Sequence, residues 1–114
     1  QNEAASTISQ IQTTIASYAD EFGVLPDSWS ELNDTSAVMT DDGPATANTF
    51  DEKITLAGGF YTDSIEPTDN LFTITATRDD TPSLNIIACV NLTNGASAIN
   101  KGTKSAIASA PNCG

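Results

Sequence analysis

Apolar residues recur at helical spacing through the beginning of the chain. They step by 4, 3, 4, 3 and 4 positions, which keeps them on one stripe of an α-helix: Ala4, Ile8, Ile11, Ile15, Tyr18 and Phe22. We expect the other face to be solvated, because the side chains between them are polar: Ser9, Gln10, Gln12, Thr13, Thr14, Ser17, Asp20 and Glu21. The pattern predicts a helix over 1–23, since Gly23 suits a helix end and Pro26 prevents its resumption.

A connecting segment, 24–52, follows this helix. Ser28-Trp29-Ser30-Glu31 fits a capping box that opens a short helical turn. Beyond it, 33–52 mixes Asp, Thr, Ser, Ala, Gly and Pro with few apolar residues, and we expect an irregular, exposed connection. A role for Trp29 in binding a sugar or a partner is an alternative to core packing, which is the commoner use of a lone Trp beside a capped turn.

Short runs with β character occupy 53–92. They fall at 54–56, 59–61, 71–77 and 84–90, and the third alternates apolar with threonine positions, as a half-buried strand does. The turn residues 79–82 join the last two runs into an antiparallel hairpin. We therefore predict one α+β domain over 1–114, in which a long N-terminal amphipathic helix packs against a small antiparallel sheet of three or four strands.

Charge and composition exclude several functions. The formal net charge is -11, so the chain lacks the basic surface that nucleic acids or anionic membranes would require. It has no histidine, the commonest general base and metal ligand. Lys101 and Lys104 miss the Ser-x-x-Lys spacing of a nucleophile and its base. We predict that the protein is not an enzyme and uses no cofactor.

Acidic clusters are the candidate metal ligands, since carboxylates suit calcium. None has the spacing of a calcium-binding loop, so solvated turn residues explain them better, and we predict no metal site: Asp41-Asp42, Asp51-Glu52, Asp63 with Glu66 and Asp69, and Asp79-Asp80.

Cys89 and Cys113 are the two cysteines, too few for a zinc site without histidine. In a small domain rich in Ser, Thr, Asn and Ala, such a pair favours a disulfide formed in an oxidising compartment. Two buried free thiols are the alternative. A disulfide would bound a C-terminal loop over 89–113.

Two stretches carry a family resemblance. The helix end, Tyr18-Ala19-Asp20-Glu21-Phe22-Gly23-Val24-Leu25-Pro26, followed by Ser30-Glu31-Leu32, resembles type IV pilins and type II secretion pseudopilins. Cys89 at a strand end and the penultimate Cys113 are similar to the pair that bounds the C-terminal loop of type IV pilins. Many pseudopilins lack that bridge. The resemblance therefore implies a pilin-like roll, with a joined Cys89–Cys113 pair.

The resemblance also implies a structural function. A pilin head would belong to a subunit that polymerises into an extracellular fibre for attachment, motility or related surface roles, with other pilin subunits and the assembly machinery as partners. Before assembly it would be anchored in the inner membrane with a periplasmic head. The family's apolar half-helix, which supplies both anchor and polymer contact, lies outside this sequence. The alternatives are a pseudopilin and a secreted binding module or adhesin that acts alone.

Overall fold

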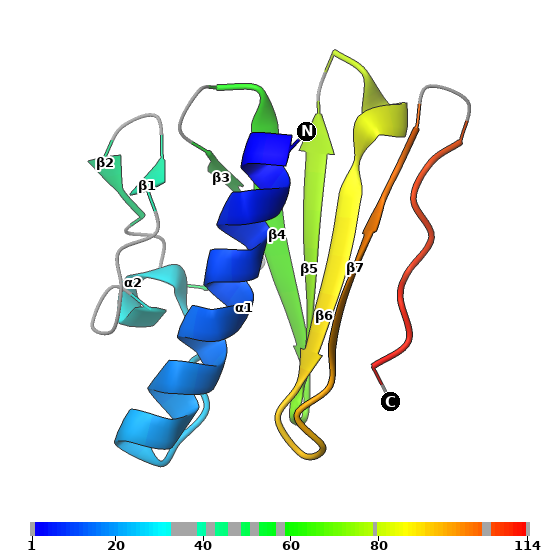
Figure 1. The fold of residues 1–114 in the computed structure, drawn as a ribbon. Helices are drawn as coiled ribbons and strands as arrows, with labels where there is room; N and C mark the ends of the chain where they lie inside the picture. Colours follow the sequence, from blue (N-terminus) through cyan, green and yellow to red (C-terminus); the bar gives the residue numbers. More distant parts are fainter. Residues whose placement is uncertain are drawn as a thin grey trace.

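A long helix crosses one face of an antiparallel sheet in the computed structural model of the chain (Figure 1). The structure describes residues 2–32, 39–40, 43–45, 49–50, 53–56, 59–78, 80–103 and 106–113. Within those ranges the main sheet has five strands, so the α+β class is as predicted and the sheet is larger than expected.

The elements follow one another in a simple order. The helical elements are α1 (Asn2–Phe22), α2 (Trp29–Leu32) and the 3-10 turn η1 (Pro82–Leu84). A small hairpin is formed by β1 (Met39–Thr40) and β2 (Gly43–Pro44). The main sheet consists of β3 (Ile54–Thr55), β4 (Tyr61–Thr68), β5 (Leu71–Arg78), β6 (Ile86–Asn91) and β7 (Ser97–Lys101).

Each strand of the main sheet lies beside its neighbour in sequence, in the order β3-β4-β5-β6-β7. The register pairs Ile65 with Ile74, and Ile74 with Ala88. Because side chains alternate between the faces of a strand, these three residues share the face that packs on α1. The predicted hairpin between β5 and β6 is confirmed, although Leu84 belongs to η1 instead of the strand.

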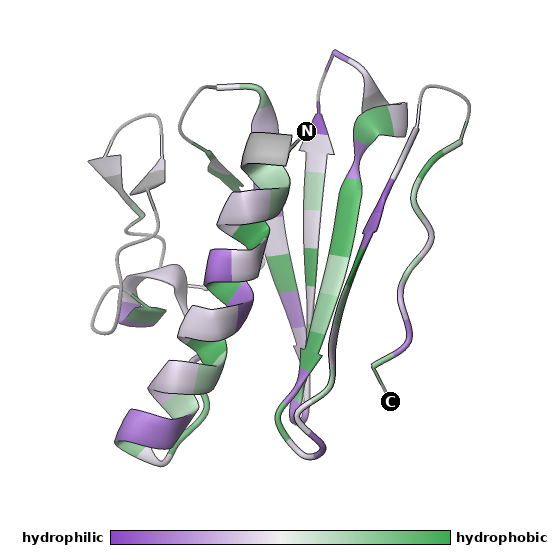
Figure 2. Ribbon diagram, viewed as in Figure 1, coloured by the Kyte–Doolittle hydropathy of each residue, from purple (hydrophilic) through white to green (hydrophobic). Residues whose placement is uncertain are grey.

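The apolar stripe of α1 lies on the sheet as predicted for most of its length. Ile8, Ile11 and Ile15 are at most 1% exposed, and Tyr18 is buried as well. Figure 2 shows apolar positions recurring along α1, opposite the strongly hydrophobic β6. The helix ends as expected at Gly23, which has a φ of 70° and donates its N–H to the Ala19 carbonyl.

Phe22 does not belong to the buried stripe, and that part of the prediction is wrong. Its side chain is 46% exposed, because it lies in the last helical turn, where the chain leaves the sheet. One side of its ring contacts Tyr18, with centroids 4.6 Å apart.

The polar face of α1 is also narrower than predicted. Gln12 and Thr14 are buried, where the sequence indicated solvated positions. The Thr14 hydroxyl donates to the Gln10 carbonyl within the helix. Gln12 instead reaches the sheet.

Two strands were missed or shortened by the prediction. β4 continues through Asp63 and Glu66 to Thr68, where the sequence indicated a short run and acidic turn residues. β7 lies inside the span 89–113, which was expected to be a loop. Both strands are rich in polar residues, so hydrophobic alternation alone does not reveal them.

The connecting segment is partly ordered against the core, in contrast to the expected exposed connection. Ala45 and Phe50 are buried. Phe50 lies between Trp29 and Phe72 in edge-to-face contacts, with centroids 5.6 Å and 6.1 Å apart. Trp29 is fully buried, which confirms core packing over ligand binding for its side chain.

The capping box that precedes α2 forms in modified form. The Ser28 hydroxyl accepts the Glu31 N–H, while the Glu31 carboxylate accepts the N–H of Asp27 in place of that of Ser28. The Tyr18 hydroxyl donates to the same carboxylate at 2.9 Å, which ties the end of α1 to α2.

Candidate functional site

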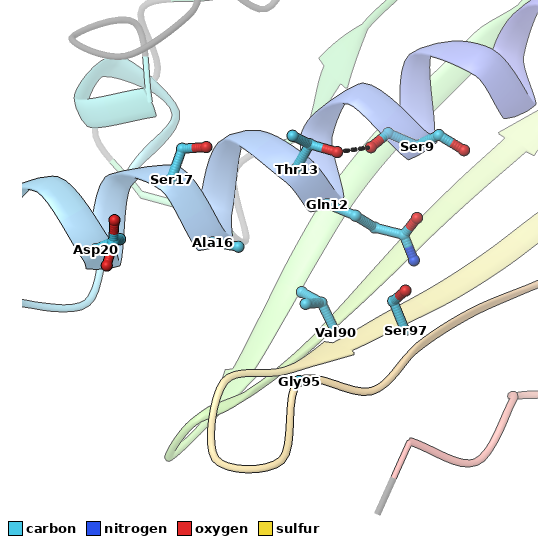
Figure 3. A pocket seen from close by; sticks show the side chains of 9 residues that line it. All are labelled: Ser9, Gln12, Thr13, Ala16, Ser17, Asp20, Val90, Gly95 and Ser97. Carbon is cyan, nitrogen blue, oxygen red and sulfur yellow. Dashed lines mark hydrogen bonds between the residues drawn. The ribbon is translucent and has the colours of Figure 1, made fainter.

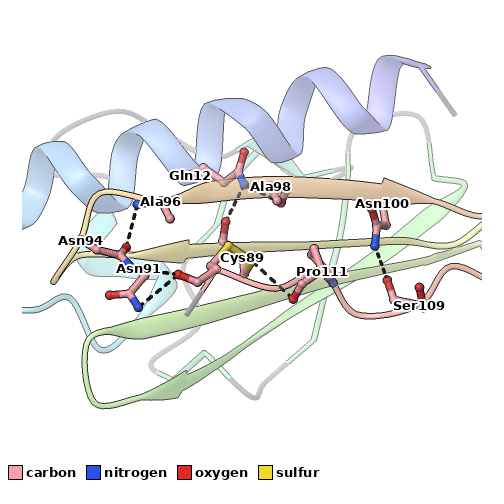
Figure 4. The surroundings of a disulfide bond; sticks show 10 residues. Gln12, Cys89, Asn91, Asn94, Ala96, Ala98, Asn100, Ser109 and Pro111 are labelled. Atoms are coloured by element: carbon pink, nitrogen blue, oxygen red, sulfur yellow. Dashed lines mark hydrogen bonds between the residues drawn. A yellow bond between two sulfur atoms is a disulfide. The ribbon is translucent and has the colours of Figure 1, made fainter.

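The C-terminal segment returns along the sheet and is covalently attached to β6 (Figure 4). Cys89 and Cys113 form a disulfide, with Cα atoms 6.1 Å apart, as predicted. Cys89 alternates with Ala88 and Val90, which face the core, so its side chain lies on the opposite face of the sheet.

Asparagine side chains hold the rest of this segment. Asn91 and Asn94 donate to the Cys113 carbonyl at 3.4 Å and 3.1 Å. Asn100 donates to the Ser109 carbonyl, and the Asn85 side-chain oxygen accepts the Ala108 N–H. The C-terminal segment is thus held to the sheet by side-chain hydrogen bonds in place of the backbone hydrogen bonds of a strand. The disulfide is one of several attachments.

Gln12 connects α1 to the same part of the sheet. Its side-chain nitrogen donates to the carbonyls of Cys89 and Ala98, at 2.9 Å and 3.1 Å. These two residues are cross-strand partners on β6 and β7. A single buried amide therefore fixes the position of the helix relative to the disulfide-bearing strand (Figure 4).

An open groove runs between α1 and the ends of β6 and β7 (Figure 3). It is lined by Ser9, Gln12, Thr13, Ala16, Ser17, Asp20, Val90, Gly95 and Ser97. The lining offers hydroxyls and one carboxylate. No imidazole or amine is among these lining residues.

The acidic clusters are not brought together in the described part of the chain. Asp63 and Glu66 alternate to opposite faces of β4, and Asp69 lies in the β4–β5 turn with a φ of 53°. Asp80 pairs with Arg78 at 2.7 Å. The remaining acidic candidates lie outside the described residues: Asp41, Asp42, Asp51, Glu52 and Asp79.

Asp63 is the one member of these clusters that the structure places in the core. It is fully buried, and neither carboxylate oxygen has a hydrogen-bond partner among the described residues. Its cross-strand neighbours, Ile54 and Ala76, are uncharged. Burial raises the pKa of Asp63 from 3.8 to about 8, because the charged form loses its hydration. The interpretation of Asp63 as a solvated turn residue is therefore wrong.

The described residues contain no group of three or more acidic or cysteine side chains arranged to hold a metal ion. No helix among them is sufficiently long and apolar to cross a membrane.

Sequence reasoning found the disulfide but not the attachments around it. The signal for them was the spacing of asparagines at 85, 91, 94 and 100, next to a segment with little apolar content. Asparagine is also common in turns, so its spacing did not by itself predict these hydrogen bonds.

Removal of the disulfide by mutation should destabilise the protein. In the chain-entropy model, closing the loop between Cys89 and Cys113 contributes about 3.5 kcal/mol to the free energy of unfolding. Double substitution of both cysteines by serine should lower the urea midpoint accordingly. The remaining asparagine contacts should keep the fold.

Alkylation without reductant, followed by intact-mass analysis, should label neither sulfur; labelling of both in the folded protein would contradict the disulfide.

Comparison of the chain with protein-family models, with curated proteins and with solved structures finds no match.

Proposed function

We propose that this chain is the head domain of a type IV pilin, a structural subunit that polymerises into a bacterial surface fibre. The observation that carries the proposal is the order of its parts. A long N-terminal helix lies on a meander sheet, and a C-terminal segment is tied to that sheet by a disulfide. Pilin-like heads place the same parts in the same order.

The helix end supports the proposal independently. Tyr18, Gly23 and Pro26, on which the resemblance depends, each have a structural task here. Tyr18 binds Glu31 of α2, and Gly23 takes the left-handed conformation that ends the helix. Pro26 is buried behind this turn. The motif thus directs the chain from the helix into the connecting segment.

The surface chemistry suits a structural part better than an active site. The groove beside α1 carries hydroxyls and the Asp20 carboxylate, and the only buried carboxylate of the described residues lies in the core, away from solvent. An acidic outer surface would keep neighbouring fibres apart through electrostatic repulsion at low ionic strength.

Expression of the full subunit tests the proposal. The gene should encode roughly 20 apolar residues running directly into Gln1, because a pilin uses such a segment as its anchor and as its polymer contact. The full subunit, expressed with an assembly system, should appear in filaments sheared from the cell surface and seen by electron microscopy. The 114-residue chain alone should sediment as a monomer at low and high salt.

The outcomes separate the alternatives. An apolar upstream segment without surface filaments would favour a pseudopilin. A full-length form that is secreted as a free monomer, or ordered filaments formed by the 114-residue chain alone, would overturn the pilin proposal and favour an autonomous binding module.

A further inference from the structure

The two ends of the sheet differ in their exposed residues. One end, here called the turn end, contains the β4–β5 turn at 69–70 and the β6–β7 turn at 92–96. Val24 and Leu25 lie here, since they line a groove together with Asn70 and Leu92. The other end, here called the far end, contains the start of β4 and the end of β7.

Both ends expose large apolar side chains. At the turn end, Val24 and Leu25 are 59% and 40% exposed, next to the half-exposed Phe22. At the far end, Phe60 and Ile107 are 59% and 66% exposed. Ile107 belongs to this end because the adjacent Ala108 binds Asn85, the residue before β6. These are all the large hydrophobic residues that are exposed in the described part of the chain.

The turn end is acidic. Among its described residues, three acidic side chains accompany no basic one: Asp20, Glu21 and Asp69. The C-terminus of α1 adds the negative end of the helix dipole. Figure 1 shows that α1 ends beside the turns of the sheet and begins at the opposite end.

The far end carries cations in its described part. Arg78 lies over the Phe60 ring, 5.0 Å from its centroid, and Lys101 is exposed at the end of β7. Among the side chains described there, Asp80 is the acidic one, and it pairs with Arg78, so the described side chains of this end carry no negative excess. The positive end of the α1 dipole is also at this end.

We propose that the turn end of one copy of this chain docks on the far end of a second copy. The contact joins the apolar residues of the two ends and brings the acidic side chains of one near Arg78 and Lys101 of the other. Contact between two turn ends would instead oppose three acidic side chains to three. Charge therefore selects the head-to-tail arrangement over a two-fold symmetric one.

Such a contact does not close on itself. A heterologous interface repeated along one direction generates a filament. The head-to-tail contact would therefore lie between neighbouring subunits of the proposed fibre, and the inference rests on that proposal. The first and last residues of β5 are about 24 Å apart, so each copy is a spacer of at least that length. The apolar patches are small, so the contact is weak unless another attachment holds the copies together.

Cross-linking of variants with one added cysteine tests this arrangement on the 114-residue chain, whose own two cysteines form the disulfide. Thr93→Cys marks the turn end and Ala106→Cys marks the far end; both positions are exposed. When the two variants are mixed at high concentration with a short bis-maleimide, the 93–106 product should exceed the 93–93 and 106–106 products by about five-fold. Thr13→Cys, exposed in the middle of α1, should show no preference for either end. The parent chain should give no product.

Charge and apolar variants distinguish docking from random collision. Lys101→Glu removes a charge at the rim of the contact, and Leu25→Ser removes an apolar contact. Each should reduce the 93–106 yield by about three-fold or more. Lys53→Glu makes the same charge change at an exposed position outside both ends and should leave the yield unchanged. A 93–106 yield no higher than random collision of equal amounts of the two variants would give, or equal effects of Lys101→Glu and Lys53→Glu, would overturn the inference.

The result is separable from the fibre proposal. Filaments of the full subunit without the 93–106 product would disprove the head-to-tail contact and leave the fibre intact. The 93–106 product from a chain that makes no filaments would support the contact and disprove the fibre.

Discussion

Replacement of Asp63 by asparagine is expected to prevent most of the loss of stability that this protein undergoes as the pH rises from about 4 to about 8. The folded-state pKa of Asp63 is about 8, against the ordinary 3.8, so the folded chain retains a proton that the unfolded chain has lost. Stability should therefore fall as the pH rises from about 4 to about 8 and become level above that range. The rise in pKa corresponds to a total loss on the order of 5 kcal/mol.

That loss is comparable with the whole free energy of unfolding of a small domain, which is about 5–15 kcal/mol. Asparagine has an uncharged side chain of nearly the same shape as aspartate, so the Asp63→Asn variant should be close to wild type at pH 4 and more stable at pH 9. Urea denaturation at pH 4, 6, 8 and 9 measures the difference.

Glu66 provides the matched control, since it is an exposed carboxylate on the same strand. Glu66→Gln should leave the slope of stability against pH as it is in the wild type. The expectation fails if the free energy of unfolding varies with pH in the same way for Asp63→Asn and wild type. The Asp63 carboxyl would then have the same pKa in the folded and unfolded chains.

Truncation of Ile15 to alanine is expected to cost about 4 kcal/mol, in the upper half of the range for buried aliphatic residues. Ile15 is fully buried in the middle of α1, where the sheet covers the helix and leaves little room for the cavity to collapse. Ser17→Ala should change the free energy of unfolding by less than about 0.5 kcal/mol, because Ser17 is only partly buried and lines the open groove.

A third variant checks the corrected boundary of the buried stripe. Phe22→Ala should cost less than Ile15→Ala, although phenylalanine is the larger residue, because nearly half of Phe22 is already exposed. Chemical denaturation of the three variants under one condition provides the comparison. Equal midpoint shifts for Ile15→Ala and Ser17→Ala would mean that the wrong face of the helix had been assigned to the core.

The sequence by itself determined the features that depend on neighbouring residues. The period of Ile8, Ile11 and Ile15 determined the helix and its buried face, because residues three and four apart share one side of an α-helix. Gly23 determined where that helix ends, and the alternation in 71–77 determined a strand. The cysteine pair was also inferred correctly from composition and position.

Tertiary structure alone decided the features that depend on distant partners. Gln12 is buried because the carbonyls of Cys89 and Ala98 receive its amide, and no local pattern announces a partner 77 residues away. Phe22 is exposed because the sheet ends before the helix does. The position of Asp63 between Ile54 and Ala76 places a carboxylate in the core, and the polar β7 becomes a strand because β6 offers it a free edge. The burial of a residue depends on the surface that it packs against. Hydrophobic periodicity in the sequence predicts that burial only where the surface is continuous along the helix or strand.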